Sequence, residues 1–266
     1  MHDLTSATDP RLAPYSRVGD AAWLLSQGLF VAEGRLVVER LMDAKRFTIE
    51  SILLTPSATN ALALRLEAVD TEVLVCSPET MKQVTGFNFH RGCLALARRP
   101  PIATIDSWLE REGVLLALEA VGNPDNVGGL FRTAAAFGAS GIFVSPSTAD
   151  PLYRKAIRTS MGAVLRVPYA RADWPDVVPA VRASGFTIVA LTPHESAEAL
   201  DQFAERQRPP RVALLLGNEG AGLSDATAAS ADVCVRIPMR TDVDSLNVAV
   251  AAGIALARLT RFADVG

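Results

Sequence analysis

The chain has 266 residues, a hydrophobic content of 49% and a formal net charge of -3. This composition predicts a well-buried globular protein with one large or two ordinary domains, and it excludes a disordered chain. The acidic balance argues against a protein that coats nucleic acid through bulk charge, although a local basic patch remains compatible with it.

The sequence carries no sign of export, membrane insertion or metal binding. No apolar run approaches the roughly 20 residues that span a bilayer, and residues 1–5 lack the basic and apolar stretches of a secretory signal. Cys76, Cys93 and Cys234 stand far apart, each within an apolar run. This arrangement predicts buried thiols in a reducing cytosol, without disulfides or a metal site. We therefore expect a cytoplasmic protein.

The first hundred residues predict an arm followed by a small domain. Residues 1–17 contain Pro10 and Pro14 and little apolar periodicity, which is typical of a flexible N-terminal arm. Residues 18–100 alternate between strands and helices. Strands are expected at 29–32, 47–54, 72–76 and 92–97, and helices at 34–45, 60–68 and after Ser77. This alternation predicts a small α/β domain.

A linker is expected at Arg98-Arg99-Pro100-Pro101, because two consecutive prolines break both helix and sheet. Its two arginines are either phosphate contacts or a solvated linker. Residues 101–266 then form a second domain with near-continuous apolar strands, which indicates a parallel sheet covered on both faces. Strands are expected at 114–118, 142–144, 165–167, 186–191, 212–216 and 233–237, and helices at 127–137, 151–158, 174–183, 224–229 and 246–262.

The last helix is apolar on more than one side, so it either lies deep in the domain or packs on a second subunit.

The first polar loop of the second domain, residues 123–132, directly follows a strand, and ligands of open α/β sheets bind beyond the carboxyl ends of strands. Gly128 and Gly129 permit close backbone approach at a helix start, where free N–H groups favour an anion. Asn126 and Arg132 are near enough in the chain to share a site. A capping asparagine and a surface-paired arginine would give the same pattern.

Two further loops have the same character. The loop 217–223 also follows a strand, and its glycines suit the edge of an adenosine, with Glu219 as a hydrogen-bond acceptor. It lacks both the G-x-G-x-x-G spacing and a suitably placed acid, which disfavours a nicotinamide enzyme. The loop 237–247 combines apolar side chains with Ser245 and Asn247, a mixture that suits a heteroaromatic ring. Ser245 is also a plausible helix N-cap.

Taken together, the three loops resemble a known family. Asn126-x-Gly128-x-x-x-Arg132, Gly217-Asn218-Glu219-Gly220 and Ile237-Pro238-Met239 followed by Ser245-Leu246-Asn247 are similar, in order and spacing, to the three motifs of the SpoU (TrmH-like) RNA methyltransferases of the SPOUT superfamily. Arg158-Thr159-Ser160-Met161-Gly162-Ala163 resembles a segment between the first two motifs. The resemblance covers residues 114–262. It extends more faintly over residues 30–100, where Glu33-Gly34 and His90-Arg91-Gly92 resemble a substrate-binding domain of the L30e/L7Ae type.

The resemblance implies transfer of a methyl group from S-adenosyl-L-methionine to a ribose 2′-hydroxyl of structured RNA. The acidic composition and the separate N-terminal domain suit a structured RNA recognised by its shape and a few arginines, so we expect rRNA rather than tRNA. The resemblance further implies a trefoil knot in the C-terminal domain, a homodimer formed through that domain, and no metal. The chain departs from the family pattern at Asn123, Thr241 and Ala249, which bears on loop shape and not on a proposed catalytic group.

The resemblance also assigns roles to single residues. Arg132 matches the catalytic arginine, and Asn126, Glu219, Ser245 and Asn247 match the polar groups that position it and the ribose. The matching cofactor cradle consists of Leu216, Gly217, Asn218, Gly220, Ile237, Pro238, Met239 and Leu246. RNA contacts are expected from Arg91, Arg98, Arg99 and Arg158. The alternatives are methylation of a base nitrogen and an RNA-binding protein without catalysis, which loss of Arg132, Glu219 or Asn247 would have favoured.

Overall fold

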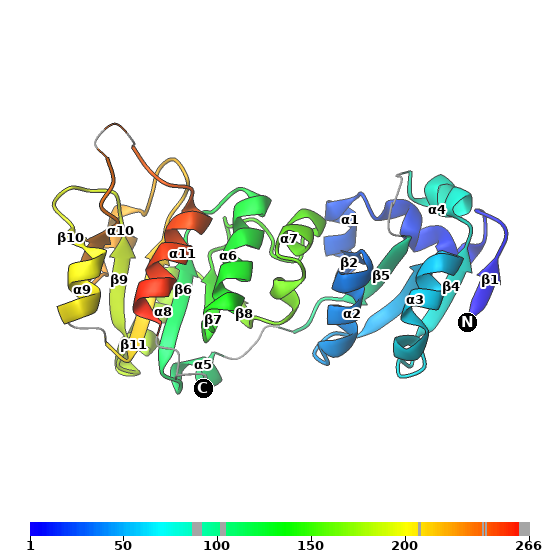
Figure 1. Cartoon of the computed structure of the whole chain (residues 1–266), viewed down its shortest axis with the longest axis horizontal. Coiled ribbons are helices and arrows are strands. Elements are labelled where there is room, and N and C mark those ends of the chain that lie inside the picture. The colour runs from blue at the N-terminus through cyan, green and yellow to red at the C-terminus, as the bar shows by residue number, and fades with distance from the viewer. Residues whose placement is uncertain (87–91, 102–104, 207–208, 241, 243, 261–266) are drawn as a thin grey trace. The chain divides into compact units, whose positions relative to one another are not determined.

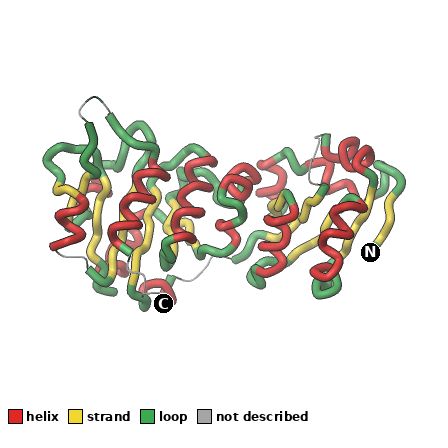
Figure 2. The backbone as a smooth tube through the Cα atoms, viewed as in Figure 1, coloured by secondary structure: helices red, strands yellow, loops and turns green. Residues whose placement is uncertain are grey.

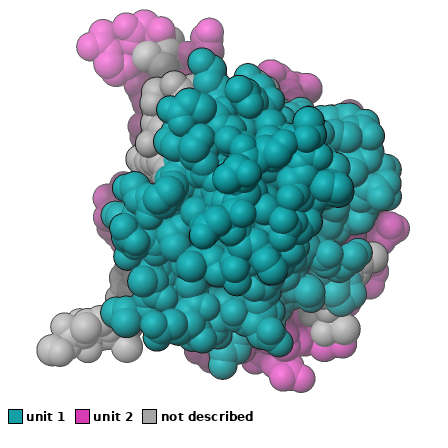
Figure 3. Space-filling view, turned by 90° about the vertical axis from the view of Figure 1, so that its right-hand side faces the viewer, with its two compact units in different colours: residues 1–101, 152–166 teal, residues 102–151, 167–266 magenta. Residues whose placement is uncertain are grey.

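The computed structural model describes all residues except 87–91, 102–104, 207–208, 241, 243 and 261–266. The chain forms two compact units, coloured separately in Figure 3. The first comprises residues 1–101 and 152–166, and the second comprises residues 102–151 and 167–266. Each unit contains one sheet lined by helices (Figure 2). No described helix combines the length and the apolar character that a membrane crossing requires.

The first unit has a five-stranded mixed sheet in the order β1-β4-β3-β5-β2. Its strands are β1 (His2–Leu4), β2 (Leu29–Glu33), β3 (Ile49–Leu54), β4 (Glu72–Cys76) and β5 (Cys93–Arg98); its helices are η1 (Pro10–Arg17), α1 (Ala21–Ser26), α2 (Arg35–Asp43), α3 (Pro56–Leu66), α4 (Pro78–Thr85), α7 (Arg154–Thr159) and η2 (Ala163–Leu165). On one face, Tyr15 of η1 and Met81 of α4 share a core with Leu53 and Leu74. The helices α2 and α3 pack against each other and cover the opposite face (Figure 1).

The N-terminal residues are part of this unit, so the predicted flexible arm at residues 1–17 is wrong. Leu4 pairs with Cys76 in the parallel β1–β4 ladder. Leu12 and Tyr15 are buried, and the Tyr15 hydroxyl lies 2.8 Å from the Ser51 hydroxyl. Local periodicity missed this region because its order comes from pairing with residues far along the chain.

The first of the two segments that form the first unit ends at residue 101, next to the predicted boundary. The predicted second domain, residues 101–266, is not continuous. Residues 152–166 pack within the first unit, where Ala156 and Ile157 of α7 are buried and α7 contacts the edge strand β2. Arg154 also lies 3.7 Å from Glu33 of β2. The segment therefore covers a strand edge that would otherwise be exposed, and the chain passes between the two units three times.

The second unit has a seven-stranded sheet in the order β10-β12-β9-β11-β6-β7-β8, and every pairing in it is parallel. Its strands are β6 (Gly113–Leu118), β7 (Gly141–Val144), β8 (Tyr169–Arg171), β9 (Thr187–Leu191), β10 (Glu198–Ala199), β11 (Arg211–Leu216) and β12 (Val233–Arg236); its helices are α5 (Asp106–Leu109), α6 (Pro124–Ala136), α8 (Trp174–Ala183), α9 (Leu200–Arg206), α10 (Asp225–Ala229) and α11 (Val248–Leu259). The parallel α/β architecture expected from the apolar strands is confirmed.

Helices cover both faces of this sheet. Trp108 of α5 and Trp174 of α8 pack with Phe143 and Leu215 in one core. The helices α6, α9 and α11 lie on the other face (Figure 1). Between α6 and α11 the backbones approach closely, because a Cβ atom added to Gly129 would lie 2.9 Å from the Cβ of Ala249. This close crossing joins the first polar loop to the last helix.

Two local predictions are wrong. Residues 165–167 do not form a strand: Leu165 ends the 3-10 helix η2, and the edge strand β8 begins only at Tyr169. Cys234 is exposed, whereas Cys76 and Cys93 are buried as expected. Alternate residues of a strand face opposite sides, and in β12 it is Val235, not Cys234, that is fully buried.

Candidate active site

The site lies where the parallel strands end. Leu118 of β6 is in register with Leu216 of β11, and Val235 of β12 with Leu191 of β9. Because parallel strands end at the same edge of a sheet, the chain segments that follow them meet there. These segments include all three polar loops singled out in the sequence.

The loop after β11 is a tight turn closed by backbone pairing. The Asn218 N–H donates to the Gly222 carbonyl at 2.9 Å, and the Gly222 N–H donates back at 3.0 Å. A Cβ atom on Gly217 would lie 2.2 Å from the Gly222 carbonyl carbon, so only glycine fits there. The Asn218 side-chain oxygen accepts from the N–H groups of Gly220 and Ala221 at 2.8 and 3.0 Å. The turn is therefore rigidly specified by its own residues.

The same turn is tied to the end of β6. The Asn218 amide donates to the Ala120 carbonyl at 2.7 Å. Ala120 has a φ of 53°, a left-handed conformation that costs a non-glycine residue about 1 kcal/mol. Its N–H is held by the Ser145 hydroxyl at 2.9 Å. Strained backbone of this kind persists only where its surroundings hold it, and it clusters at functional sites.

A chain of three polar side chains links the three loops. The Asn247 amide donates to the Asn126 side-chain oxygen at 2.8 Å, and the Asn126 amide donates to a Glu219 carboxylate oxygen at 2.8 Å. The Asn247 oxygen accepts from the N–H groups of Ala249 and Val250, so it caps α11. Asn247, and not Ser245, is thus the N-cap. The predicted site residues Asn126, Glu219 and Asn247 are brought together by this network.

The Glu219 carboxylate is held by backbone as well. It accepts from the N–H groups of Gly122 and Asn123, each at 3.3 Å. Burial alone would raise the pKa of Glu219. The hydrogen bonds from Asn126, Asn123 and Gly122 outweigh that effect and hold the pKa below its ordinary value. The carboxylate is therefore charged at neutral pH and acts as an acceptor.

A second carboxylate fixes the far end of the turn. Glu119 accepts from the N–H and the hydroxyl of Ser224, at 2.9 and 2.7 Å, and from the Thr227 hydroxyl at 2.8 Å. Ser224 is the N-cap of α10. Glu119 was not among the predicted site residues, although its position directly after β6 was a usable signal.

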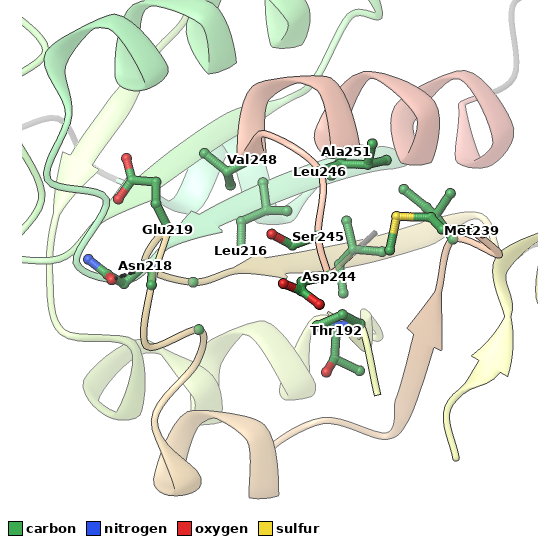
Figure 4. A pocket seen from close by; sticks show the side chains of 16 residues that line it. Thr192, Leu216, Asn218, Glu219, Met239, Asp244, Ser245, Leu246, Val248 and Ala251 are labelled. Carbon is green, nitrogen blue, oxygen red and sulfur yellow. Dashed lines mark hydrogen bonds between the residues drawn. The ribbon is translucent and has the colours of Figure 1, made fainter. Parts of the chain in front are cut away.

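A pocket of about 300 Å³ opens beside this network, within the second unit. It is lined by Leu191, Thr192, Pro193, Leu216, Gly217, Asn218, Glu219, Gly220, Gly222, Ile237, Met239, Asp244, Ser245, Leu246, Val248 and Ala251. Figure 4 shows Leu216 and Ser245 at its middle, with Met239 at one end and Asn218 and Glu219 at the other. Apolar walls interrupted by a few polar groups and a glycine turn are typical of small-molecule sites.

The lining includes all but one of the eight residues expected in the cofactor cradle. The exception is Pro238, which does not line the pocket. Ser245 does line it. Thr192 and Pro193 were not predicted as site residues. They directly follow β9, so their position after a parallel strand was a signal that could have found them.

The remaining predicted residues lie outside the pocket. Arg132 is exposed on α6 and has no side-chain hydrogen bond or ion pair among the described residues. Arg158 is exposed at the end of α7. Arg98 pairs with Glu50 at 2.5 Å, and Arg99 donates to the Leu29 carbonyl at 3.1 Å. Arg91 lies outside the described residues.

The residues present fit S-adenosyl-L-methionine. Leu216, Met239 and Leu246 offer apolar surface to a heteroaromatic ring, and the rigid turn offers backbone groups to its edge. The Asp244 carboxylate supplies negative charge for a cationic ligand. Among the described residues, no three His, Cys, Asp or Glu side chains are grouped as a metal site would require.

Solved structures place this architecture among the RNA methyltransferases. The AdoMet-bound rRNA methyltransferase from Sinorhizobium meliloti matches with a TM-score of 0.82 and 30% identity, covering 97% of both chains. An RNA 2′-O ribose methyltransferase matches with a TM-score of 0.78 and 28% identity, covering 97% of this chain and 98% of that chain. The α/β fold with a parallel sheet and the S-adenosyl-L-methionine cofactor, both expected from the sequence, are therefore found in solved relatives.

The chain belongs to the SpoU rRNA Methylase family, whose model matches residues 113–257. It is 39% identical to the uncharacterized tRNA/rRNA methyltransferase Rv0881 of Mycobacterium tuberculosis, over 98% of this chain and 92% of that protein. It is 25% identical to the 23S rRNA (guanosine(2553)-2′-O)-methyltransferase RlmP of Bacillus subtilis, over 96% and 97% of the two chains. The family resemblance carried by the three motifs is confirmed.

Proposed function

We propose that the protein is an S-adenosyl-L-methionine-dependent RNA methyltransferase that methylates a ribose 2′-hydroxyl. The observation that carries this proposal is the Asn247–Asn126–Glu219 network, which joins all three motif loops beside one pocket. When bound, the cofactor supplies an electrophilic methyl group. A nicotinamide enzyme would not need these three side chains, and neither would an RNA-binding protein without catalysis.

Arg132 is the residue we assign to the reacting ribose. A 2′-hydroxyl is a weak nucleophile because its pKa lies far above neutrality, so a positive charge near the oxygen lowers the cost of the developing alkoxide. Arginine is effectively always protonated, which suits electrostatic stabilisation better than proton removal. The exposed Arg132 guanidinium is available to a bound RNA. Ser245 lines the pocket and is assigned to positioning the ribose.

The substrate we propose is rRNA in preference to tRNA. RlmP, similar over nearly the whole chain, is named for 23S rRNA, and the S. meliloti structure is that of an rRNA methyltransferase. Both relatives are similar over nearly the whole chain, and so over the first unit as well. We assign substrate binding to this unit and propose that it is a domain of the L30e/L7Ae type. Arg91, Arg98, Arg99 and Arg158 are proposed to contact the RNA; of the described ones, Arg158 has the most accessible placement, since Arg98 and Arg99 already have partners.

Three further features belong to the proposal. The trefoil knot is implied by family membership. A homodimer through the second unit is supported by Val250 and Ile254 on α11, which are 53% and 37% exposed although both are large and apolar. The cytoplasm is the compartment where such RNA is modified, and it suits three free cysteines.

The test is incubation of the protein with radiolabelled cofactor and unmodified 23S rRNA or tRNA transcripts, followed by digestion to nucleosides. We expect label in a 2′-O-methyl nucleoside of the rRNA and its loss in Arg132→Ala. Arg111→Ala, which removes another exposed arginine of the second unit, serves as the control and should retain activity. Label on a base would overturn the ribose assignment, and cofactor binding without transfer to any RNA would overturn catalysis on naked RNA.

A further inference from the structure

A second and larger hollow lies wholly within the first unit, and none of its residues belongs to the candidate active site. Its volume is about 720 Å³, and it is lined by Leu36, Glu39, Arg40, Asp43, Ala44, Lys45, Arg46, Arg65, Leu165 and Arg166. Five of these side chains are cationic and two are acidic, a local balance of +3. The whole chain has a net charge of -3, so this concentration of positive charge runs against the overall composition.

The two carboxylates of the lining leave most of this positive charge uncompensated. Asp43 is paired with Arg65 at 2.5 Å. Glu39 lies 3.9 Å from Arg35, a cation outside the lining. The other four cations of the lining are Arg40, Lys45, Arg46 and Arg166.

Two of these four donate hydrogen bonds to backbone carbonyls. Arg40 donates to the Met161 carbonyl, and Arg46 donates to the Val164 carbonyl at 2.9 Å. Both carbonyls belong to the segment 152–166 that packs into this unit. A carbonyl fixes the direction of a guanidinium group, so the segment 152–166 helps to hold both arginine side chains in place.

The other two are free to meet a ligand. Lys45 and Arg166 are exposed, and their side chains have no hydrogen bond or ion pair among the residues that the structure describes. They lie more than a hundred residues apart in the sequence but line the same hollow. Fixed arginines beside accessible cations are what a site for a polyanion requires, since the fixed groups lose little entropy on binding.

We propose that this hollow binds the phosphodiester backbone of the RNA substrate. Guanidinium groups match phosphate oxygens in a forked geometry, and such contacts position RNA without reading its sequence. The lining contains no aromatic side chain on which a base would stack, which favours the backbone over the bases. The proposal rests on RNA being the substrate and adds a contact surface that none of the three motifs contains.

The test uses the full chain with Lys45→Gln and Arg166→Gln combined, and Lys82→Gln as a matched control. Lys82 is exposed on α4, which packs on the opposite face of the sheet from α2 and α3. Binding of an unmodified 23S rRNA transcript is measured against salt concentration. Each phosphate contact contributes about 0.7–0.9 to the slope of log affinity against log salt. We expect the slope to fall by about 1.5 and the affinity to fall about thirtyfold at 0.1 M salt, with cofactor affinity unchanged.

A double variant whose affinity and salt slope equal those of the wild type would overturn the proposal, and so would an equal loss in Lys82→Gln. The single Arg166→Gln variant should lose about half the slope change. RNA binding and methyl transfer are measured separately. If RNA binding is weakened in the double variant but the wild type transfers no methyl group, the phosphate site is upheld and the proposed function is refuted. If the wild type transfers methyl groups but RNA binding is the same in the double variant, the proposed function is upheld and the phosphate site is refuted.

Discussion

Replacement of Glu219 by glutamine tests the polarity of the network between the motif loops. The substitution keeps the shape of the side chain but replaces one acceptor oxygen with an NH2 donor. Both carboxylate oxygens face donors: one accepts from Asn126 and Asn123, and the other accepts from Gly122. Either orientation of the new amide therefore sets a donor against a donor.

The network cannot relax by reversing its amides. If Asn126 turned its oxygen toward the new amide, its NH2 group would face the NH2 group of Asn247. Asn247 cannot turn in its place, because its oxygen caps α11 by accepting from Ala249 and Val250. The direction of the whole network is thus fixed by the helix end, and only a carboxylate terminates it without conflict.

The expected cost follows from the hydrogen bonds that the substitution removes. A hydrogen bond to a charged group contributes about 1.5–3 kcal/mol when buried, and an unsatisfied donor costs a similar amount. Two of the three hydrogen bonds to the Glu219 carboxylate are 3.3 Å long and exposed to solvent. Solvent screening therefore reduces the expected total cost of the substitution to about 2–3 kcal/mol. If the loops must be ordered in the transition state, kcat/KM falls about 30- to 150-fold.

The assay is steady-state methyl transfer to the 23S rRNA transcript, with cofactor binding measured by calorimetry. Glu195→Gln makes the same chemical change at an exposed position of the second unit that has no side-chain partner in the described part of the chain, and it should leave both quantities unchanged. Glu219→Gln combined with Asn126→Ala should lose less than the sum of the two single effects, because the residues act as one network. A kcat/KM within threefold of wild type, on the order of 0.7 kcal/mol, would refute the argument.

Four other measurements follow. Gly217→Ala should weaken cofactor binding at least about 100-fold by calorimetry, because its Cβ would collide with the Gly222 backbone and overpacking of the turn costs about 3 kcal/mol. Burial raises the pKa of Cys76 to about 11 and that of Cys93 to about 12, so at pH 8 a disulfide reagent should titrate one fast thiol, which Cys234→Ser removes. The pKa of Glu219 is lower in the folded protein than its ordinary value of 4.5, so the charged carboxylate stabilises the fold at pH values above 4.5. This stabilisation is lost as the pH falls through the pKa of the folded state. The difference in unfolding free energy between wild type and Glu219→Gln should therefore be constant from about pH 6 to 8 and shrink in acid. Val250→Asp should convert the proposed dimer to a monomer in light scattering, because the interface would bury an unpaired charge.

The sequence predicted well what depends on local pattern. The apolar runs at 114–118 and 212–216 correspond to β6 and β11, each of which begins one residue earlier than predicted, because a strand buried on both faces leaves a continuous signal. The polar residues after those strands marked the site, because parallel strands end at one edge. The motif residues Asn126, Glu219 and Asn247 were expected together and lie within hydrogen-bonding distance.

What the sequence did not reveal depends on contacts between distant residues. The pairing of β1 with β4 joins residues about seventy positions apart and leaves no periodic trace in a three-residue strand. The segment 152–166 follows the first motif in the chain, yet its buried side chains belong to the first unit. Glu50 gave no sign that it would pair with Arg98, so a predicted RNA contact has an intramolecular partner. The accessible cations of the basic hollow come from two separate stretches and were equally invisible.

The three passages of the chain between its units have a consequence for biosynthesis. Residues 1–101 leave the ribosome without the segment 152–166 that covers β2 and orients Arg40 and Arg46. The first unit therefore reaches its final form only after part of the second has been made, instead of folding as an independent N-terminal module. Truncation at Pro100-Pro101, where the sequence predicts a domain boundary, would yield a fragment that lacks residues 152–166 of the first unit. A chimaera that exchanges the first unit between related enzymes would have to include both of its segments, residues 1–101 and 152–166.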